Sequence, residues 1–298
     1  MRNTIFALML MAYALVAQAA DNQQLAVLAQ GDQFPSFNRA GSPKLGSAIA
    51  LIYDEQTQRP LYTKNANDVV PIASITKLMT AMVVLDARLP LDERITISSL
   101  DRDRFKGTRS RMRNGMTLTR GELMKLALMA SENVAAAALA RTYPGGSHVM
   151  LAMMNAKARE LGMHSTRFDD ATGLHSSNVS TAHDLVRMVT AAGEYEEIER
   201  FTTARSHTVQ VSSRSTLRFN NTNPLVRNAS WDIGLSKTGY ISEAGRCLVM
   251  QAKISNRPVV IVLLDSWGKH TRVGDANRIK NWMEGTRPIR AVRHTRRG

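Results

Sequence analysis

Residues 74–87 read Ser-Ile-Thr-Lys-Leu-Met-Thr-Ala-Met-Val-Val-Leu-Asp-Ala. Apolar side chains recur in this stretch with helical spacing, at Ile75, Leu78, Met79, Met82, Val83 and Leu85. The spacing predicts a helix buried in the core of the protein. Ser74 and Lys77 stand three positions apart at its start, so their side chains share one face of that helix.

A serine beside a lysine can be a nucleophile, with the amine as its base. Lys77 would then need a pKa near neutrality instead of its usual value of about 10.4, a change worth about 4 kcal/mol, through burial and a nearby cation. The same spacing recurs at Ser266-Trp-Gly-Lys269. The pair alone is therefore weak evidence for an active site.

A second candidate is Ser131-Glu-Asn133, which lies 57 residues after Ser74 at the joint between two predicted helices. A turn of this kind can direct a hydroxyl and an amide into a cleft. Ser36-Phe-Asn38 and Ser176-Ser-Asn178 have the same form. A simple helix cap is the alternative, because Ser and Asn both favour that position.

A third candidate is Lys237-Thr-Gly239, which occurs once, in an apolar stretch typical of a strand. Lys237 and Thr238 at a strand edge can bind a carboxylate, and Gly239 lets a substrate backbone approach closely. The alternative is an exposed strand residue followed by a bulge.

The remaining pattern predicts strands near both ends of the chain and helices between them. The expected strands are 47–53, 61–64, 95–97, 209–211, 216–219, 235–240, 246–254 and 258–264. The expected helices begin near Ser74, Thr119 (a capping box with Glu122), Glu132, Ser147, Thr181 and Val273. This arrangement indicates an α+β fold, in which a sheet built from both chain ends accompanies a helical subdomain.

The N-terminus has the form of a secretory signal peptide. Arg2 precedes an apolar run over residues 5–17, and Ala17-Gln-Ala19 supplies a cleavage pattern. The run is too short to span a membrane, and the alternative is a buried N-terminal helix. We therefore expect residues 1–19 to be removed on export, near Ala19, and residues 20–45 to form a linker or loose arm.

The composition excludes several classes of protein and indicates the charge of the partner. Of 298 residues, 44% are apolar and 21% charged, which excludes a disordered chain and a multispanning membrane protein. The single cysteine, Cys247, excludes an intrachain disulfide and a Cys/His zinc site. The net charge of +14, or +13 without residues 1–19, implies an anionic partner.

The three candidates in this order resemble the signature of penicillin-binding proteins and serine β-lactamases. Ser266 and Lys269 do not fit it, because they follow a predicted strand and have no downstream partners. Longer segments are similar to low-molecular-mass D-alanyl-D-alanine peptidases over residues 46–284, and most of all to their endopeptidase branch. These segments are SITKLMTAMVVLDA, ALMASENVAAAALA, NAKARELGM, TRFDDATGLHSSNVSTAHDL, KTGYISEAGRCLVM and LDSWGKHTRVGDANRIKNW.

The resemblance implies a β-lactamase/transpeptidase-like fold, with an antiparallel sheet flanked by helices, a helical subdomain and the active site between them. It implies no metal and no organic cofactor. The implied catalytic residues are Ser74 as nucleophile, Lys77 as base and Ser131 as proton relay. The implied substrate-binding residues are Asn133, Lys237, Thr238, Gly239 and Tyr240, with the backbone N–H groups of Ser74 and Tyr240 as oxyanion hole.

The implied function is a penicillin-sensitive periplasmic peptidase that cleaves D-alanyl-diaminopimelate crosslinks in peptidoglycan, with β-lactams as covalent inhibitors. Only 59 residues follow Gly239, too few for the additional domain of the family's carboxypeptidases. Residues 168–174 lack the Glu-x-x-Leu-Asn pattern of β-lactamases, so a bound penicillin should stay attached to Ser74. Two alternatives remain: a D-alanyl-D-alanine carboxypeptidase that trims pentapeptide stems, and a non-catalytic murein-binding regulator.

Two basic segments stay open in interpretation. The loop over residues 102–113 is either solvated or attracts peptidoglycan carboxylates. The tail over residues 285–298 is basic between 287 and 297. It either contacts anionic membrane lipid or has no fixed structure. Only Phe105 interrupts these basic runs as an aromatic residue, which, together with export, argues against nucleic acid as the partner.

Overall fold

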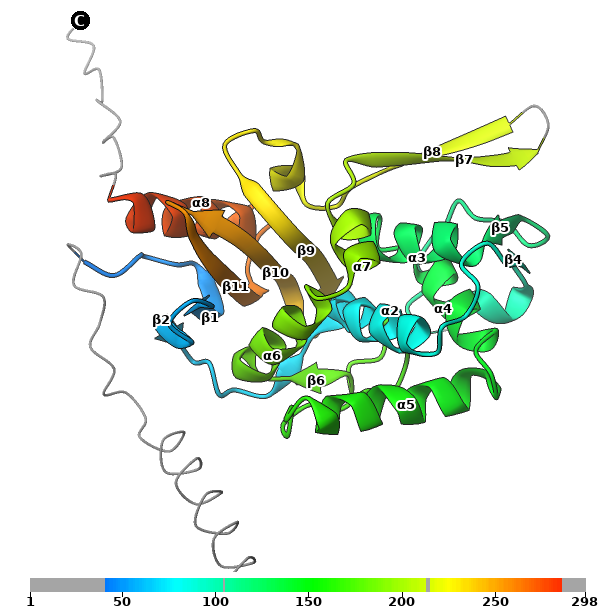
Figure 1. Ribbon diagram of the computed structural model, residues 1–298, viewed down its shortest axis with the longest axis horizontal. Helices are drawn as coiled ribbons and strands as arrows, with labels where there is room; N and C mark the ends of the chain where they lie inside the picture. Colours follow the sequence, from blue (N-terminus) through cyan, green and yellow to red (C-terminus); the bar gives the residue numbers. More distant parts are fainter. Residues whose placement is uncertain (1–40, 104, 213–214, 286–298) are drawn as a thin grey trace, which may run out of the picture. The chain divides into compact units, whose positions relative to one another are not determined.

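The computed structural model describes residues 41–103, 105–212 and 215–285 (Figure 1). The chain divides into two units, residues 1–38 and 39–298, and every described residue belongs to the second unit. The expected signal peptide, most of the expected arm and the basic tail beyond Gly285 lie outside the described residues. Within the described ranges, no helix combines the length and apolar character needed to cross a membrane.

An antiparallel five-stranded sheet joins the two ends of the described chain. Its strands, in spatial order, are β2 (Arg59–Lys64), β1 (Ser47–Asp54), β11 (Arg257–Ser266), β10 (Gly245–Ile254) and β9 (Asp232–Ile241). The prediction of a sheet built from both ends of the chain is confirmed. The order leaves β9, the strand that carries Lys237-Thr-Gly239, at the sheet edge.

The sheet is buried on both faces, which explains the uninterrupted apolar run of β11. Val260, Val262 and Leu264 pack into one core cluster, with the helical part of the protein. The alternate residues of β11 pack into a second cluster beneath α8 (Thr271–Glu284). Because strand side chains alternate between faces, only a run that is apolar at every position can fill both clusters.

The helical part contains six α-helices among the described residues. They are α2 (Lys77–Asp86), α3 (Arg120–Met129), α4 (Asn133–Arg141), α5 (Gly146–Glu160), α6 (Ala182–Ala192) and α7 (Glu196–Thr202). Helix α2 is buried from Lys77 to Val84, as its apolar spacing predicts. The capping box of Thr119 and Glu122 at the start of α3 is confirmed.

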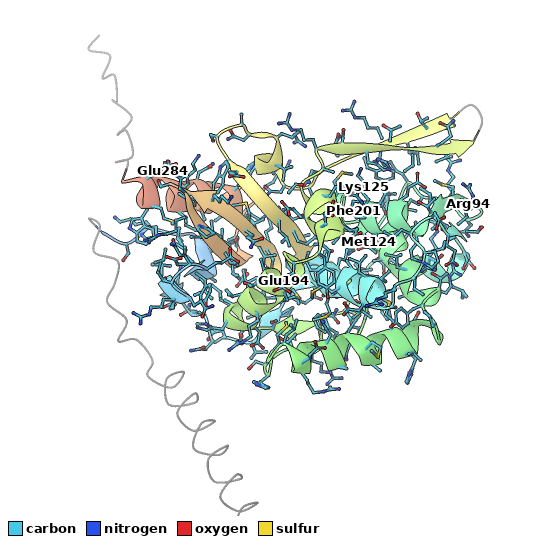
Figure 2. The ribbon with its side chains drawn as sticks, in the orientation of Figure 1. Arg94, Met124, Lys125, Glu194, Phe201 and Glu284 are labelled. Atoms are coloured by element: carbon cyan, nitrogen blue, oxygen red, sulfur yellow. The ribbon has the colours of Figure 1, made fainter. Side chains whose placement is uncertain are left out.

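Helix α7 was not predicted, because its first turn is rich in glutamate and its apolar face is short. It packs against α3, where Phe201 is buried and the Lys125 ammonium lies 5.9 Å from the centre of its ring (Figure 2). The expected helix from Ser74 also begins differently. Its first residues form a 3-10 turn, η1 (Ala73–Thr76), and the α-helix starts only at Lys77.

Short strand pairs and 3-10 turns complete the described chain. The pairs are β3 (Val70–Pro71) with β6 (Val179–Ser180), β4 (Arg94–Thr96) with β5 (Thr117–Thr119), and the hairpin β7 (Ser206–Ser212) with β8 (Ser215–Asn220). The turns are η2 (Ser99–Asp101) and η3 (Pro224–Arg227). Helix α2 lies among the other helices (Figure 1), and the turn η1 at its N-terminal end contacts β9 and β10, so this end lies where the helical part meets the sheet.

Candidate active site

Ser74 lies in the 3-10 turn that leads into α2, and it is 8% exposed. The residue before it, Ala73, has φ +48°, a left-handed conformation that side chains other than glycine rarely adopt. Backbone strain of this kind is typical of functional sites, where the surrounding structure enforces it. The turn places the serine hydroxyl one helical turn before Lys77.

Lys77 is completely buried and donates hydrogen bonds from Nζ in three directions. The acceptors are Ser74 Oγ at 2.8 Å, Asn133 Oδ1 at 2.7 Å and the Thr172 carbonyl at 2.6 Å. Burial lowers the pKa of Lys77 from 10.5 to about 7, against the opposing effect of the carboxylates of Asp170 and Glu132. A substantial fraction of this amine is therefore neutral at neutral pH, as a base requires.

Ser131 lies in the turn between α3 and α4 and faces the third sequence motif. Its φ of +60° is again left-handed, which tilts the side chain away from the path of either helix. Lys237 Nζ donates to Ser131 Oγ at 2.9 Å and to the Thr238 carbonyl at 2.8 Å. Asn133, two residues on, opens α4 and reaches Lys77, so the turn contacts both lysines.

The strand β9 closes the site from the sheet side. Lys237 is buried, and burial lowers its pKa well below 10.5, with the positive charges of Lys77 and Arg272 acting in the same direction. A Cβ atom on Gly239 would lie 3.0 Å from the Ile72 carbonyl and 3.2 Å from Ser74 N. Glycine is needed here because the strand passes so close to the serine turn.

The structure thus forms two hydrogen-bonded groups from residues far apart in sequence, Ser74 with Lys77 and Asn133, and Ser131 with Lys237, and the turn over residues 131–133 contributes to both. Residues 37–268 match the peptidase S11 family, described as D-alanyl-D-alanine carboxypeptidases. The chain belongs to this family.

Known members of the family are similar in sequence and structure. The D-alanyl-D-alanine endopeptidase of Pseudomonas aeruginosa is 48% identical over 83% of this chain and 81% of its own length. The endopeptidase of Escherichia coli is 46% identical over 82% of this chain and 79% of its own. The crystal structure of the Streptomyces K15 DD-transpeptidase superposes with a TM-score of 0.76, at 29% identity, over 82% of this chain and 98% of that one. The resemblance and the fold class inferred from sequence are confirmed.

Two side chains near the S11 signature residues did not emerge from the sequence motifs. Arg272 of α8 donates from Nη1 to the Gly239 carbonyl at 2.8 Å and to the Cys247 carbonyl at 3.0 Å. Thr222 Oγ1 lies 2.6 Å from Thr238 Oγ1. Arg272 lies within one of the segments that resemble the family, and that resemblance was the sequence signal that could have indicated it. No sequence motif pointed to Thr222.

Tyr240, near the end of β9, is exposed, whereas Cys247 in β10 is buried. The Tyr240 side chain is 56% exposed, and the Arg246 guanidinium stacks 4.5 Å from its ring centre. The predicted oxyanion role concerns its backbone N–H and not this exposed side chain. Burial raises the pKa of the Cys247 thiol to about 11, so this cysteine is an unreactive core residue, as expected.

The basic loop after η2 contacts the Ser131 turn. Asn133 Nδ2 donates to Thr108 Oγ1 at 3.1 Å, and Ser110 Oγ donates to Glu132 Oε2 at 2.8 Å. Lys106 forms an ion pair with Glu243, in the turn between β9 and β10. The loop thus contacts both the helical part and the sheet, and its described residues Lys106, Arg109, Arg111 and Arg113 are exposed.

Proposed function

We propose that this S11 peptidase is a penicillin-sensitive serine DD-endopeptidase that cleaves D-alanyl-diaminopimelate crosslinks of peptidoglycan through an acyl-enzyme. The observation that carries the proposal is the environment of Lys77, a buried amine whose pKa is lowered to about 7 and which contacts Ser74 Oγ at 2.8 Å. Ser74 is the proposed nucleophile and Lys77 its base.

The contacts of Lys77 support that role. A neutral amine has two N–H groups and one lone pair. The oxygens of Asn133 and Thr172 that face Nζ can only accept hydrogen bonds, so they occupy both N–H groups. The lone pair is then left for the third neighbour, Ser74, whose hydroxyl donates its proton to Nζ as its oxygen attacks.

Acylation is proposed to begin with attack of Ser74 on the substrate. Ser74 Oγ bonds to the D-alanyl carbonyl carbon, its proton passes to Lys77, and the carbonyl oxygen becomes an oxyanion. The N–H groups of Ser74 and Tyr240 are proposed to stabilise that charge, and such a donor is typically worth about 3–4 kcal/mol. The carbonyl then re-forms as the C–N bond breaks, and the proton held by Lys77 passes through Ser131 to the leaving amine with the help of Lys237. Water later hydrolyses the ester, which releases the carboxylate product and restores the Ser74 hydroxyl.

Substrate recognition is proposed to involve the free carboxylate beside the scissile bond. Lys237 and Thr238 bind it, Gly239 and Tyr240 line its approach, and Asn133 holds the substrate amide. Thr222 supports this role, because its hydroxyl fixes that of Thr238. Arg272 holds the Gly239 carbonyl in place and adds a positive charge near this edge.

The relatives favour the endopeptidase alternative. Those at 46–48% identity are named D-alanyl-D-alanine endopeptidases. The relatives named carboxypeptidases that were compared are 24–30% identical. We propose residues 46–284 as the catalytic domain, residues 1–19 as a signal peptide that directs it to the periplasm, residues 20–45 as an arm and residues 285–298 as a tail.

Penicillin is proposed to remain on Ser74 once bound. Asp170 is the acidic residue of the nearby loop that acts on Lys77, but its two carboxylate oxygens accept hydrogen bonds from the backbone N–H groups of Thr172, Gly173 and His175. A carboxylate whose two oxygens already accept these bonds has little capacity left to accept a hydrogen bond from a water molecule. It cannot readily activate a deacylating water.

The test digests crosslinked muropeptide dimers and monomeric pentapeptides side by side, with chromatography of the products. We expect the dimers to be converted to monomers faster than the pentapeptides lose D-alanine, and Ser74→Ala to do neither. Faster trimming of pentapeptides would replace the proposal with the carboxypeptidase alternative. Penicillin labelling without cleavage of either substrate would favour a murein-binding regulator.

A further inference from the structure

The loop between α5 and α6 presents two successive carbonyls to α2. Thr80 Oγ1 donates to the Ala171 carbonyl at 2.7 Å, and Lys77 Nζ donates to the Thr172 carbonyl at 2.6 Å. Lys77 and Thr80 are three residues apart and so share one face of the helix. One of the three contacts of the proposed base is thus a backbone atom of this loop.

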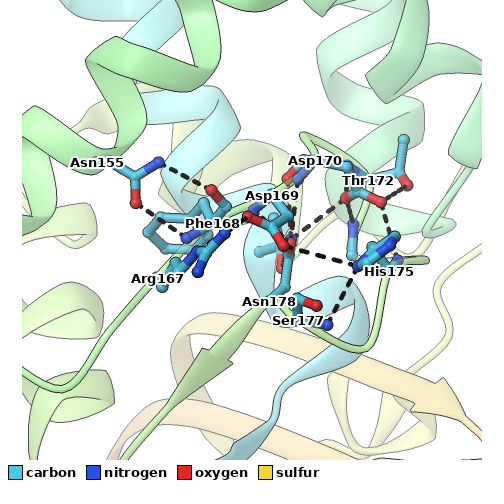
Figure 3. A network of polar contacts seen from close by, with 11 residues as sticks. Asn155, Arg167, Phe168, Asp169, Asp170, Thr172, His175, Ser177 and Asn178 are labelled. Carbon is cyan, nitrogen blue, oxygen red and sulfur yellow. Dashed lines mark hydrogen bonds and ion pairs between the residues drawn. The ribbon is translucent and has the colours of Figure 1, made fainter.

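The Asp170 side chain fixes the conformation of the loop around that carbonyl (Figure 3). Its carboxylate accepts from Thr172 N at 2.8 Å, His175 N at 2.9 Å, Gly173 N and, at 3.3 Å, Thr172 Oγ1. Hydrogen bonds to a charged acceptor are among the stronger ones in proteins. The peptide units on both sides of the Thr172 carbonyl are therefore held by a single side chain.

Asn178 ties this loop to the turn that carries Ser74. It is completely buried, and its Oδ1 accepts from Asp169 N at 2.8 Å and Asp170 N at 3.1 Å. Its Nδ2 donates to the Asp170 carbonyl at 2.9 Å and to Thr76 Oγ1 at 3.0 Å. Its own carbonyl accepts from Ile72 N at 3.0 Å.

We propose that Asp170 and Asn178 are positioning residues for the peptidase reaction, which hold the Thr172 carbonyl against Lys77 Nζ and so keep the lone pair of the amine directed at Ser74 Oγ. The inference rests on the proposed role of Lys77 as the base. An amine can rotate about its Cε–Nζ bond. Without an acceptor at the Thr172 position, an N–H group can occupy the direction of Ser74, and proton transfer slows.

The charges around Lys77 provide a second readout. Asp170 from the loop and Glu132 from the α3–α4 turn both raise the pKa of Lys77, whereas burial lowers it. The other cation nearby is Lys237 of β9, whose own pKa is lowered in part by Lys77. Removing the charge of Asp170 should therefore lower the pKa of Lys77 and move the acidic limb of the acylation profile to lower pH.

The test measures acylation of the full chain by a fluorescent penicillin at pH 5–9, separating the limiting acylation rate from the binding constant. We expect Asp170→Ala and Asn178→Ala to slow the limiting rate by about tenfold or more, since misplaced catalytic groups are costly, with the binding constant little changed. Asp170→Asn keeps an oxygen acceptor, so it should recover most of the rate while showing the shifted acidic limb.

Asp169→Ala is the matched control, because the Asp169 carboxylate pairs with Arg167 and His175 and makes no contact with Thr172. Rates are expressed per active site that can be labelled at saturation, and thermal melting reports folding. Wild-type limiting rates in both Asp170→Ala and Asn178→Ala would overturn the proposal. So would an equal loss in Asp169→Ala, since it would indicate general disruption of the loop. A wild-type chain that does not acylate would instead refute the proposed function.

Discussion

Two Ser-x-x-Lys sequences occur in this chain, and only one forms a site. Ser74 and Ser266 are both buried, at 8% and 2% exposure. Ser74 lies in a helical turn, and Lys77 returns to it one turn later at 2.8 Å. Ser266 is the last residue of β11, its hydroxyl pairs with Ser47 Oγ at 2.7 Å, and the chain then turns out to an exposed Lys269.

The difference shows what the spacing requires. Positions i and i+3 share a face only in a helix, so the same letters after a strand place the two groups apart. The helix also takes Lys77 into the core, where desolvation favours the neutral amine. Lys269 lies exposed at the surface. Backbone conformation and burial, more than the residue types, distinguish the lysine proposed as the base from the exposed one.

The largest expected contrast is between the two serines. Ser74→Ala should abolish labelling by a fluorescent penicillin, because the acyl-enzyme cannot form without the hydroxyl. Ser266→Ala should leave labelling intact and reduce the free energy of unfolding by about 1 kcal/mol, through the lost hydrogen bond to Ser47. Gel fluorescence and urea unfolding measure the two effects. Stoichiometric labelling of Ser74→Ala would remove it as the nucleophile.

The lysines should differ nearly as much. Lys77→Ala is expected to slow acylation by about 100-fold or more, as for loss of a general base, whereas Lys269→Ala should match wild type. Because a protonated amine has no lone pair, wild-type acylation should fall as the pH falls through about 7, the pKa of Lys77. Stopped-flow rates against pH provide the measurement. Full activity of Lys77→Ala at neutral pH would contradict the assignment.

Two glycines with left-handed backbone extend the comparison to stability. Gly173, beside the Ser74 turn, has φ +77°, and a Cβ atom there would lie 1.9 Å from the Ala73 carbonyl. Gly268, between Ser266 and Lys269, has φ +86° but would meet only Thr271 Oγ1, at 3.1 Å. Gly268→Ala should cost about 1 kcal/mol of unfolding free energy, and Gly173→Ala about 3 kcal/mol or more. Equal melting temperatures would show that the loop accommodates the methyl group.

The smallest contrast concerns two threonines. Thr222→Val removes the hydroxyl that lies 2.6 Å from Thr238 Oγ1, and it should weaken penicillin binding by about fivefold, the worth of one hydrogen bond of about 1 kcal/mol. Thr271→Val removes a hydroxyl that donates to the Trp267 carbonyl, within the second Ser-x-x-Lys sequence, and should leave penicillin binding unchanged. The binding constant for a slowly acylating β-lactam distinguishes them.

Sequence reasoning reached the side chains of the site because their types and order are informative. It placed Lys77 at the start of a buried helix and Lys237 on a strand, and the sheet joins the chain ends as expected, whereas Ser74 lies in a 3-10 turn before the helix. The contact of the Thr172 carbonyl with Lys77 could not be predicted from the sequence, since every residue has a backbone carbonyl. Only the folded loop shows which one faces Lys77.

Three other features of the structure could not be predicted from the sequence, because they depend on tertiary packing. The 3-10 start of the Ser74 helix contains the left-handed Ala73, which is packed closely against Gly239 of β9 and Gly173 of the neighbouring loop. Helix α7 is stabilised by burial of Phe201 against α3 more than by its own pattern. Arg272 acquires its contacts only when α8 packs beneath the sheet.

The pairing of β1 with β11 has a consequence for the time at which activity can arise. Leu51 pairs with Val262, so the middle of the sheet is completed only after almost the whole described chain has been synthesised. Contacts between such distant segments form late in folding. Ser74 and Lys77 emerge from the ribosome early, but Lys237 needs β10 and, through it, β11 to hold its place. A partly made chain therefore carries Ser74, the proposed nucleophile, without the strand that completes its site, and hydrolytic activity waits for the finished fold.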